Sequence, residues 1–542
     1  MIYKIVSCLI VISSLSVSQG VSAWSNDLNV GYDVTNLVLD PHTTNTDANL
    51  QLTAHVFSKL IRRDNDFKIE NDLAQVFKQI SDTDWYVELR PNAFFSDHTP
   101  VTSDDVKCTI DRIKRLKRGV YANVSMLTDL VKINDRSFIL KTATVYPLLP
   151  NSLALVQILS CHQPGIELDA NLPADQLIGS GPYKVASFSP TTELSLERNP
   201  NHFGRPSFWK TVTFHVITDA ETRYQALLKG DVDLIVSAPT VHLSDITADA
   251  RFEKAQRDSY STLLFTLDQY RDGVSTGQSL QYLTLKSGGP LPGNPLKLLK
   301  FRRALSLALD RQGIVAAGMF GAGSPGKFIA PIVTEGVVDS DLNPVPTQDL
   351  AMANQLLNEA AAEDPKWSFL AQRDLKIVFQ VSTARTAMAQ VIASNWRQLG
   401  FTVDFQALPA ATMLSRGGAP NYEFQIMLPS WGADSGELSS SLKALLATVG
   451  AQPGWGGSNR GRYSNSAIDV LLGKALLEMD TTTRTQLLHQ GTDLAMQDQA
   501  VLPVAYLKNT WYFKKSLCFE PRVENHFYAF LTKPENIFGK CN

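Results

Sequence analysis

The sequence has little cysteine, no excess of positive charge and almost no long hydrophobic run. Only 5 of its 542 residues are cysteine and none form a CxxC pair, so redox catalysis and structural zinc lack their usual ligand spacing. The 50 lysine and arginine residues stand against 53 aspartate and glutamate residues, a formal net charge of −3. Because nucleic-acid-binding proteins usually carry a basic face, that class is not favoured. Past the N-terminus, no segment reaches the ~20 apolar residues that span a membrane.

Catalytic motifs are also scarce. None of the nine histidines are spaced i,i+4, and the chain has neither a Walker phosphate loop nor a GxGxxG that follows a strand. One GxSxG match covers 273–277 in a polar, turn-like stretch, whereas a nucleophile elbow needs a strand before Ser275 and a helix after it. We interpret it as a chance match in a loop and expect no enzyme. A secreted α/β hydrolase built on Ser275 is the alternative from another functional class.

The N-terminus carries an export signal. Lys4 provides a short positive region, residues 5–17 are apolar, and Val21-Ser22-Ala23 offers small residues for cleavage. This layout predicts a signal peptide over residues 1–23, cleaved after Ala23, and therefore a periplasmic protein. A retained anchor would need a longer apolar stretch, and a lipoprotein would need its cysteine after that stretch, whereas Cys8 precedes it.

Four cysteines remain after this cleavage. An even, small number in an exported chain suits one or two disulfides. We favour Cys518 with Cys541, which would tie down the C-terminal tail, and Cys108 with Cys161 in the N-terminal half. Four free thiols are the alternative.

Strand-like and helix-like patterns alternate along the chain, which predicts an α/β fold. Residues 85–89 and 211–216 alternate as half-buried strands, and Asp104 and Asp105 place acidic residues at the start of a helix. Residues 301–315 have the apolar spacing of one continuous helix. Since cores stop growing at roughly 250–300 residues, we expect two or three domains.

A series of short motifs follows in order along the chain. They are Leu39-Asp40-Pro41-His42, Leu89 to Asp97 with Asp105-Val106, Gly179-Ser180-Gly181-Pro182-Tyr183, Glu197-Arg198-Asn199-Pro200, Leu227 to Asp233, Arg303 to Arg311, and Tyr463-Ser464-Asn465. Together they resemble extracytoplasmic solute-binding proteins of family 5, the oligopeptide/dipeptide/nickel-binding type that serves ABC importers. The matches cover about residues 37–510. His98 departs from the pattern, because the family has glycine there.

The resemblance implies a two-lobed periplasmic-binding-protein fold of type II, cluster C, with an extra inserted domain. Domain I would combine residues 24–45, 170–270 and 500–542. Domain II would be an insertion over 46–169, and domain III, over 271–499, would form the opposing lobe. Crossing chain segments would serve as the hinge.

The resemblance also implies a ligand site. Ser430 to Asp434 is similar to the family's W-x-x-D segment, so Asp434 would pair with a peptide's amino group while Trp431, Gly432 and Ala433 line the cleft. Asn45 stands where oligopeptide binders often have an acidic residue, which would weaken a second contact to that group. Tyr121 is a further cleft candidate. Arg460 is a candidate for a ligand carboxylate, although a solvated loop is the simpler interpretation. His42 reads as a structural histidine, not a metal or haem ligand.

The expected function is capture of a small solute, with peptide as the leading ligand, and its delivery to the permease subunits of an ABC transporter. We expect a monomer without cofactor or bound nucleic acid. Family members that bind haem, nickel chelates, opines or oligosaccharides remain alternatives, as does a periplasmic chaperone or sensor partner with the same fold.

Overall fold

A computed structural model of the chain describes residues 26–34, 37–168, 170–271, 282–289 and 291–535. The expected signal peptide, Ser275 and Cys541 lie outside these ranges. Within them, the helices are too short or too polar to traverse a lipid bilayer.

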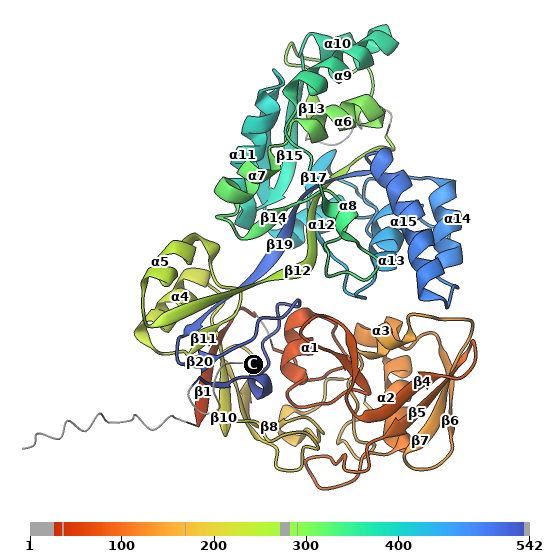
Figure 1. The fold of residues 1–542 in the computed structure, drawn as a ribbon, viewed down its shortest axis with the longest axis vertical. Helices are drawn as coiled ribbons and strands as arrows, with labels where there is room; N and C mark the ends of the chain where they lie inside the picture. The colour runs from red at the N-terminus through yellow and green to blue at the C-terminus, as the bar shows by residue number, and fades with distance from the viewer. Residues whose placement is uncertain (1–25, 35–36, 169, 272–281, 290, 536–542) are drawn as a thin grey trace, which may run out of the picture.

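Two long antiparallel strands, β12 (Phe252–Leu267) and β19 (Val501–Lys514), run between two lobes (Figure 1). They lie at the centre of a thirteen-stranded sheet that continues into both lobes. On the first side its strands are β11 (Leu234–Ile235), β1 (Asp27–Tyr32), β10 (Thr211–Val216), β9 (Glu193–Arg198) and β8 (Tyr183–Ser189). On the second side they are β17 (Ile426–Leu428), β15 (Lys376–Ser382), β13 (Leu283–Thr284), β14 (Gly323–Pro325), β16 (Thr402–Leu408) and β18 (Ser430–Gly432).

The first lobe also holds a four-stranded antiparallel sheet and the C-terminal segment. The order in that sheet is β4 (Ala74–Gln79), β5 (Asp84–Leu89), β7 (Ser137–Thr142), β6 (Leu127–Lys132). Two small hairpin-like pairs join β2 (Ile61–Arg63) to β3 (Ile69–Asn71) and β20 (Leu517–Cys518) to β21 (Lys533–Pro534). Its helices are α1 (Asp47–Thr53), α2 (Ser103–Leu116), α3 (Leu149–Leu153), α4 (Ala220–Lys229) and α5 (Leu243–Ala248).

The second lobe contains the remaining helices. They are α6 (Leu299–Leu307), α7 (Arg311–Gly313), α8 (Asp339–Leu342), α9 (Leu350–Glu363), α10 (Ser368–Ala371), α11 (Thr386–Arg397), α12 (Ala410–Gly417), α13 (Leu438–Ser441), α14 (Ser466–Ala475) and α15 (Thr481–Gln497). Each lobe is built on its own hydrophobic clusters, one around Phe214 and another around Phe138 in the first lobe, and one around Trp396 in the second. The two-lobed α/β fold expected from the sequence is therefore confirmed.

The predicted secondary structure is mostly confirmed, with one correction. The strands expected over 85–89 and 211–216 are β5 and β10. The single helix expected over 301–315 is wrong: α6 ends at Leu307, and a new helix starts at Arg311. Asp310 makes the break, because its carboxylate accepts a hydrogen bond from Gly313 N (2.9 Å) and caps the second helix.

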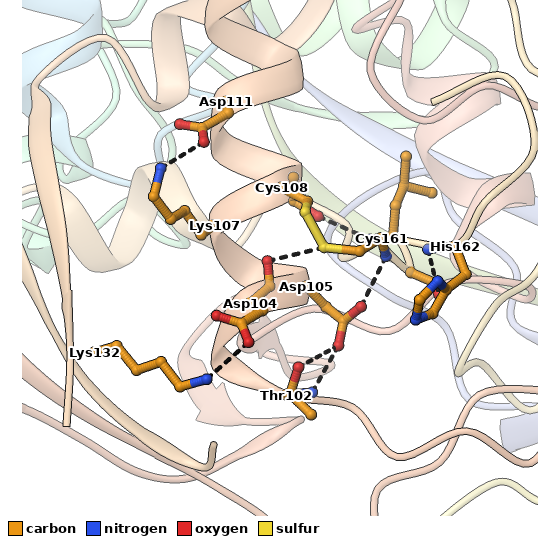
Figure 2. The surroundings of a disulfide bond; sticks show 12 residues. Thr102, Asp104, Asp105, Lys107, Cys108, Asp111, Lys132, Cys161 and His162 are labelled. Carbon is orange, nitrogen blue, oxygen red and sulfur yellow. Dashed lines mark hydrogen bonds and ion pairs between the residues drawn. A yellow bond between two sulfur atoms is a disulfide. The ribbon is translucent and has the colours of Figure 1, made fainter. Parts of the chain in front are cut away.

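At the start of α2, the side chain of Asp105 caps the helix and also contacts the segment that carries the disulfide (Figure 2). Asp105 Oδ2 accepts from the backbone N of Thr102 (2.8 Å), and Asp105 Oδ1 accepts from the backbone N of Cys161 (2.8 Å). A disulfide joins Cys161 to Cys108, the pairing favoured from the sequence. The acidic residues here therefore serve the helix start, as expected. The expected pairing of Cys518 with Cys541 stays a prediction, because Cys541 lies outside the described residues.

Candidate functional site

A cavity of about 440 Å³ lies where the lobes meet and is lined mostly by the first lobe, with Tyr260 from β12 and Asp434 from the second lobe. This volume falls within the roughly 300–1,000 Å³ typical of small-molecule sites. Side chains of both charges and several aromatic rings form its wall. The acidic ones are Asp47, Asp64, Glu70, Asp72, Asp434 and Glu524; the basic ones are Lys59, Arg62, Arg63 and Arg522; and the aromatic ones are Phe57, Phe67, Tyr260, Tyr528 and Phe530.

Asp434 is held at the wall by the end of β18. This strand pairs with β12, and the backbone N of Ala433 donates to Tyr260 O (3.1 Å). A Cβ at Gly432 would lie 2.6 Å from the Tyr260 ring, so only glycine lets that ring pack against the strand. Trp431 packs on a hydrophobic cluster of the second lobe. These three residues thus shape the segment that presents Asp434.

Two carboxylates from opposite lobes face the cavity. Asp434 comes from the second lobe, and Asp47, the first residue of α1, from the first. Burial raises the pKa of Asp434 and the negative charge of Asp47 raises it further, while the positive charge of Arg63 partly offsets both. Tyr260 donates its hydroxyl to Asp47 Oδ2 (3.0 Å). Among the described residues, neither carboxylate has a basic group within ion-pair distance, so both are available to a cationic ligand group.

Arg63 connects the lobes beside this pair. Its guanidinium donates to Ser435 O of the second lobe (2.5 Å) and to Phe67 O (3.0 Å). It also lies 4.0 Å from the centroid of the Phe67 ring, and that ring stacks on Tyr260. Ser435 O accepts a second hydrogen bond, from Asn151 Nδ2 of the first lobe (2.7 Å). The lobes therefore touch at the rim of the cavity.

The C-terminal segment completes the wall. Arg522 donates to Arg63 O and Asp64 O (2.9 Å each) and lies 3.2 Å from Glu524 Oε2. His526 lines the cavity too; burial lowers its pKa, and the charges of Arg522 and Lys59 act in the same direction. Arg522 is thus engaged in holding the turn between β2 and β3.

The residues expected from the sequence divide into three groups. Asp434 and Asn45 line the cavity, whereas Trp431, Gly432 and Ala433, expected to line it, are not among its lining residues and instead shape the segment that carries Asp434. Tyr121 packs against the hydrophobic cluster of the first lobe, while its neighbours Ala122 and Asn123 line the cavity. Arg460 lies in the second lobe, away from this wall.

The His42 interpretation agrees with its surroundings. Its Nε2 lies 2.9 Å from Gln157 O and its Nδ1 accepts from Arg112 (3.0 Å), so both ring nitrogens are occupied. Burial lowers its pKa to about 4, which keeps it neutral. Among the described residues, no three His, Cys, Asp or Glu side chains are grouped to hold a metal ion.

Sequence reasoning missed Asp47, Lys59, Tyr260 and Arg522. Asp47 lies two residues from Asn45 at a helix start, where an acidic residue needs no ligand to explain it. Tyr260 and Arg522 come from segments far along the chain, so no local pattern joins them to Asp434.

Comparison with known proteins agrees with this geometry. Residues 68–453 match the family model described as bacterial extracellular solute-binding proteins, family 5 Middle. The probable D,D-dipeptide-binding periplasmic protein DdpA of Escherichia coli strain K12 is 25% identical over 484 residues, which cover 85% of each chain.

Solved structures share the fold at lower identity. The oligopeptide-binding protein AppA of Bacillus subtilis, in complex with a nonapeptide, superposes with a TM-score of 0.69 and 20% identity over 93% of this chain and 96% of its own. NikA of Staphylococcus aureus, in complex with Ni(L-His)2, gives a TM-score of 0.69 and 18% identity over 94% of this chain and 100% of its own.

The family match covers well over half of the chain, and the structural matches extend over both lobes. The alternative of an α/β hydrolase has no such support. The resemblance inferred from the ordered motifs is thus confirmed, and the chain belongs to the bacterial extracellular solute-binding proteins of family 5, the binding components of ABC importers, and is not an enzyme.

Proposed function

We propose that the cavity binds a short peptide, with Asp434 and Asp47 holding its free amino group. The observation that carries this proposal is a pair of carboxylates, one from each lobe, that face the cavity without a basic partner among the described residues. Two like charges in a partly desolvated site repel each other. A ligand ammonium between them would relieve that repulsion and supply charge-assisted hydrogen bonds.

The cavity volume bears on peptide length. About 440 Å³ lies in the lower part of the range for small-ligand sites. We therefore expect di- and tripeptides to bind better than long ones. The D,D-dipeptide named for the relative from E. coli is a ligand of this size class.

Closure of the lobes follows from the same contacts. An ammonium that bridges Asp47 and Asp434 binds both lobes at once, so it favours the closed form over the open one. The closed, loaded protein would then be recognised by the permease subunits. The proposal includes a monomer in the periplasm, with the signal peptide cleaved near Ala23.

Domain boundaries are part of the proposal. We assign residues 24–45, 170–270 and 500–542 to domain I, 46–169 to domain II and 271–499 to domain III. The four-stranded sheet of β4 to β7 lies within the proposed domain II, and β13 to β18 lie within the proposed domain III.

The test is calorimetric titration with di- to pentapeptides, their N-acetylated forms, haem and nickel–histidine. N-acetylation removes the positive charge and should abolish binding of an otherwise good peptide. Asp434→Asn should weaken peptide binding roughly tenfold to a hundredfold, the effect of losing a charge-assisted contact. The matched control is Asp82→Asn, an exposed turn residue outside the cavity, which should bind like the wild type. Equal affinity for acetylated and free peptides would refute the amino-group site.

A further inference from the structure

One basic side chain in the cavity differs from the others. Lys59 follows α1, and its backbone is fixed on both sides: its N donates to Asp72 Oδ2 (2.8 Å), and its O accepts from Leu73 N (2.9 Å). Lys59 is one of the residues that line the cavity. The lysine is thus presented from a rigid position in the first lobe, the lobe that also contributes Asp47.

The three arginines of the wall already have partners. Arg62 pairs with Glu70 (2.7 Å), Arg63 donates to two carbonyl oxygens, and Arg522 donates to backbone oxygens and to Glu524. Among the described residues, the Lys59 ammonium has no carboxylate within 4.0 Å and no hydrogen bond. Lys59 is therefore the cation of this wall that is left for a ligand.

The surroundings of Lys59 favour an incoming anion. Burial lowers the pKa of Lys59 to about 8. The negative charges of Glu524 and Asp72 raise this pKa, whereas the positive charges of Arg63 and Arg522 lower it. Glu524 is engaged by Arg522, and Asp72 by the backbone N of Lys59 itself. A poorly solvated ammonium without a partner is costly, and a ligand carboxylate would supply the missing charge and hydrogen bonds.

The cavity thus has two kinds of pole. Asp47 and Asp434 supply negative charge without a basic partner, and Lys59 supplies positive charge without an acidic one. Both poles line the same cavity, so they belong to one site.

We propose that Lys59 is a second anchor, which binds a carboxylate of the ligand and selects short zwitterionic or acidic peptides. This inference rests on the proposed function, because it requires a peptide whose amino group is held by the opposite pole. The carboxylate comes from the C-terminus or from an acidic side chain, and the two sources share the same chemistry.

The test compares trialanine with trialanine amide by calorimetric titration. In the wild type, amidation should weaken binding roughly tenfold to a hundredfold, the range for a hydrogen bond to a charged group. In Lys59→Met, trialanine should bind as weakly as its amide, so that the discrimination disappears. Lys515→Met, an exposed lysine outside the cavity, should retain it. Lys59→Gln replaces Lys59→Met if the latter does not fold.

A second peptide pair distinguishes the source of the carboxylate. If Ala-Glu-Ala amide binds the wild type more tightly than Ala-Gln-Ala amide and Lys59→Met abolishes the difference, an acidic side chain is the partner. Equal binding within both pairs, or discrimination that survives in both Lys59 variants, overturns the inference.

N-acetylated trialanine separates this failure from a failure of the proposed function. Sensitivity to acetylation, with no sensitivity to amidation and no difference between the Glu and Gln peptides, would remove the Lys59 anchor and leave the amino-group site standing. Failure of every peptide to bind would overturn both.

Discussion

Asp40 and Arg112 form a buried ion pair, which gives the acidic residue of the Leu39-Asp40-Pro41-His42 motif a structural role. Nη1 and Nη2 of Arg112 donate to the carboxylate, at 3.0 and 2.6 Å, and both side chains are almost fully inaccessible to solvent. Burial alone would raise the pKa of Asp40, but hydrogen bonds and charge from Arg112 outweigh it and the net pKa is lowered. The pair joins the segment before α1 to helix α2.

Replacement of this carboxylate should destabilise the protein. Asp40→Asn leaves Arg112 buried without its counter-charge, and we expect a loss of about 3–5 kcal/mol in the free energy of unfolding, measured by chemical denaturation at pH 7. Because the pKa of Asp40 is lower in the folded state, its contribution is present above the ordinary value of 3.8 and is lost as the pH falls. The difference between wild type and variant should therefore shrink in acid. A constant difference from pH 7 to pH 3 would contradict the pKa assignment.

The proposed ligand residues were only partly predictable at this scale. Asp434 lies in a contiguous motif, so a local pattern found it. Its counterpart Asp47 and the hydroxyl of Tyr260 that contacts it are 213 positions apart, and only the tertiary fold brings them together. In the sequence, Lys59 does not differ from other lysines. Its lack of a partner is a property of the folded cavity and could not be predicted from local sequence.

At the scale of elements, two of the family motifs mark special backbone geometry, a close approach at Gly181 and a left-handed turn at His98. Gly181 lies where a Cβ would come within 2.5 Å of the Val56 backbone, and its own N donates to Val56 O (2.8 Å). His98 replaces a glycine, yet the turn forms with His98 in the left-handed region at φ 71°, a conformation that histidine tolerates better than most residues. Motifs of this kind predicted the fold well, since they report backbone geometry.

The bulge in β12 was not predictable in the same way. The register between β12 and β19 shifts between Asp258 and Thr262, and Tyr260 lies in this shifted stretch. Such bulges redirect side chains next to functional sites. The alternation of residues along the sequence does not report where one strand slips against a partner more than 240 residues away.

The disulfide at α2 should stabilise the first lobe without affecting the ligand. Cys108 and Cys161 close a loop of 53 residues, so Cys108→Ser with Cys161→Ser should cost roughly 2–4 kcal/mol of stability, chiefly through a less constrained unfolded chain. Neither sulfur lines the cavity. Peptide affinity at 25 °C should therefore match the wild type, while thermal denaturation shows a lower midpoint. An unchanged midpoint, or a tenfold loss of affinity, would contradict this role.

At the scale of the whole molecule, β12 and β19 connect the two lobes, and the rim contacts decide how readily the lobes meet. Ser435 O of the second lobe accepts from Arg63 and Asn151 of the first, and Arg257 of β12 pairs with Asp66. These contacts are made by the protein's own groups, so the protein itself contributes to closure. The remaining free energy must come from the ligand, which shifts the population only by its greater affinity for the closed form.

Asn151→Ala tests whether the rim contacts contribute to closure independently of the ligand, because Asn151 contacts the opposite lobe but does not line the cavity. Loss of one hydrogen bond of about 0.5–1.5 kcal/mol should lower the closed population of the free protein and weaken peptide binding roughly two- to tenfold. Small-angle scattering should show a larger radius of gyration for the free variant and an unchanged value once peptide saturates it. Asn92→Ala, which removes a hydrogen bond within the first lobe, is the matched control. If the free variant keeps the wild-type radius of gyration while its affinity falls, Asn151 acts on the ligand and not on closure.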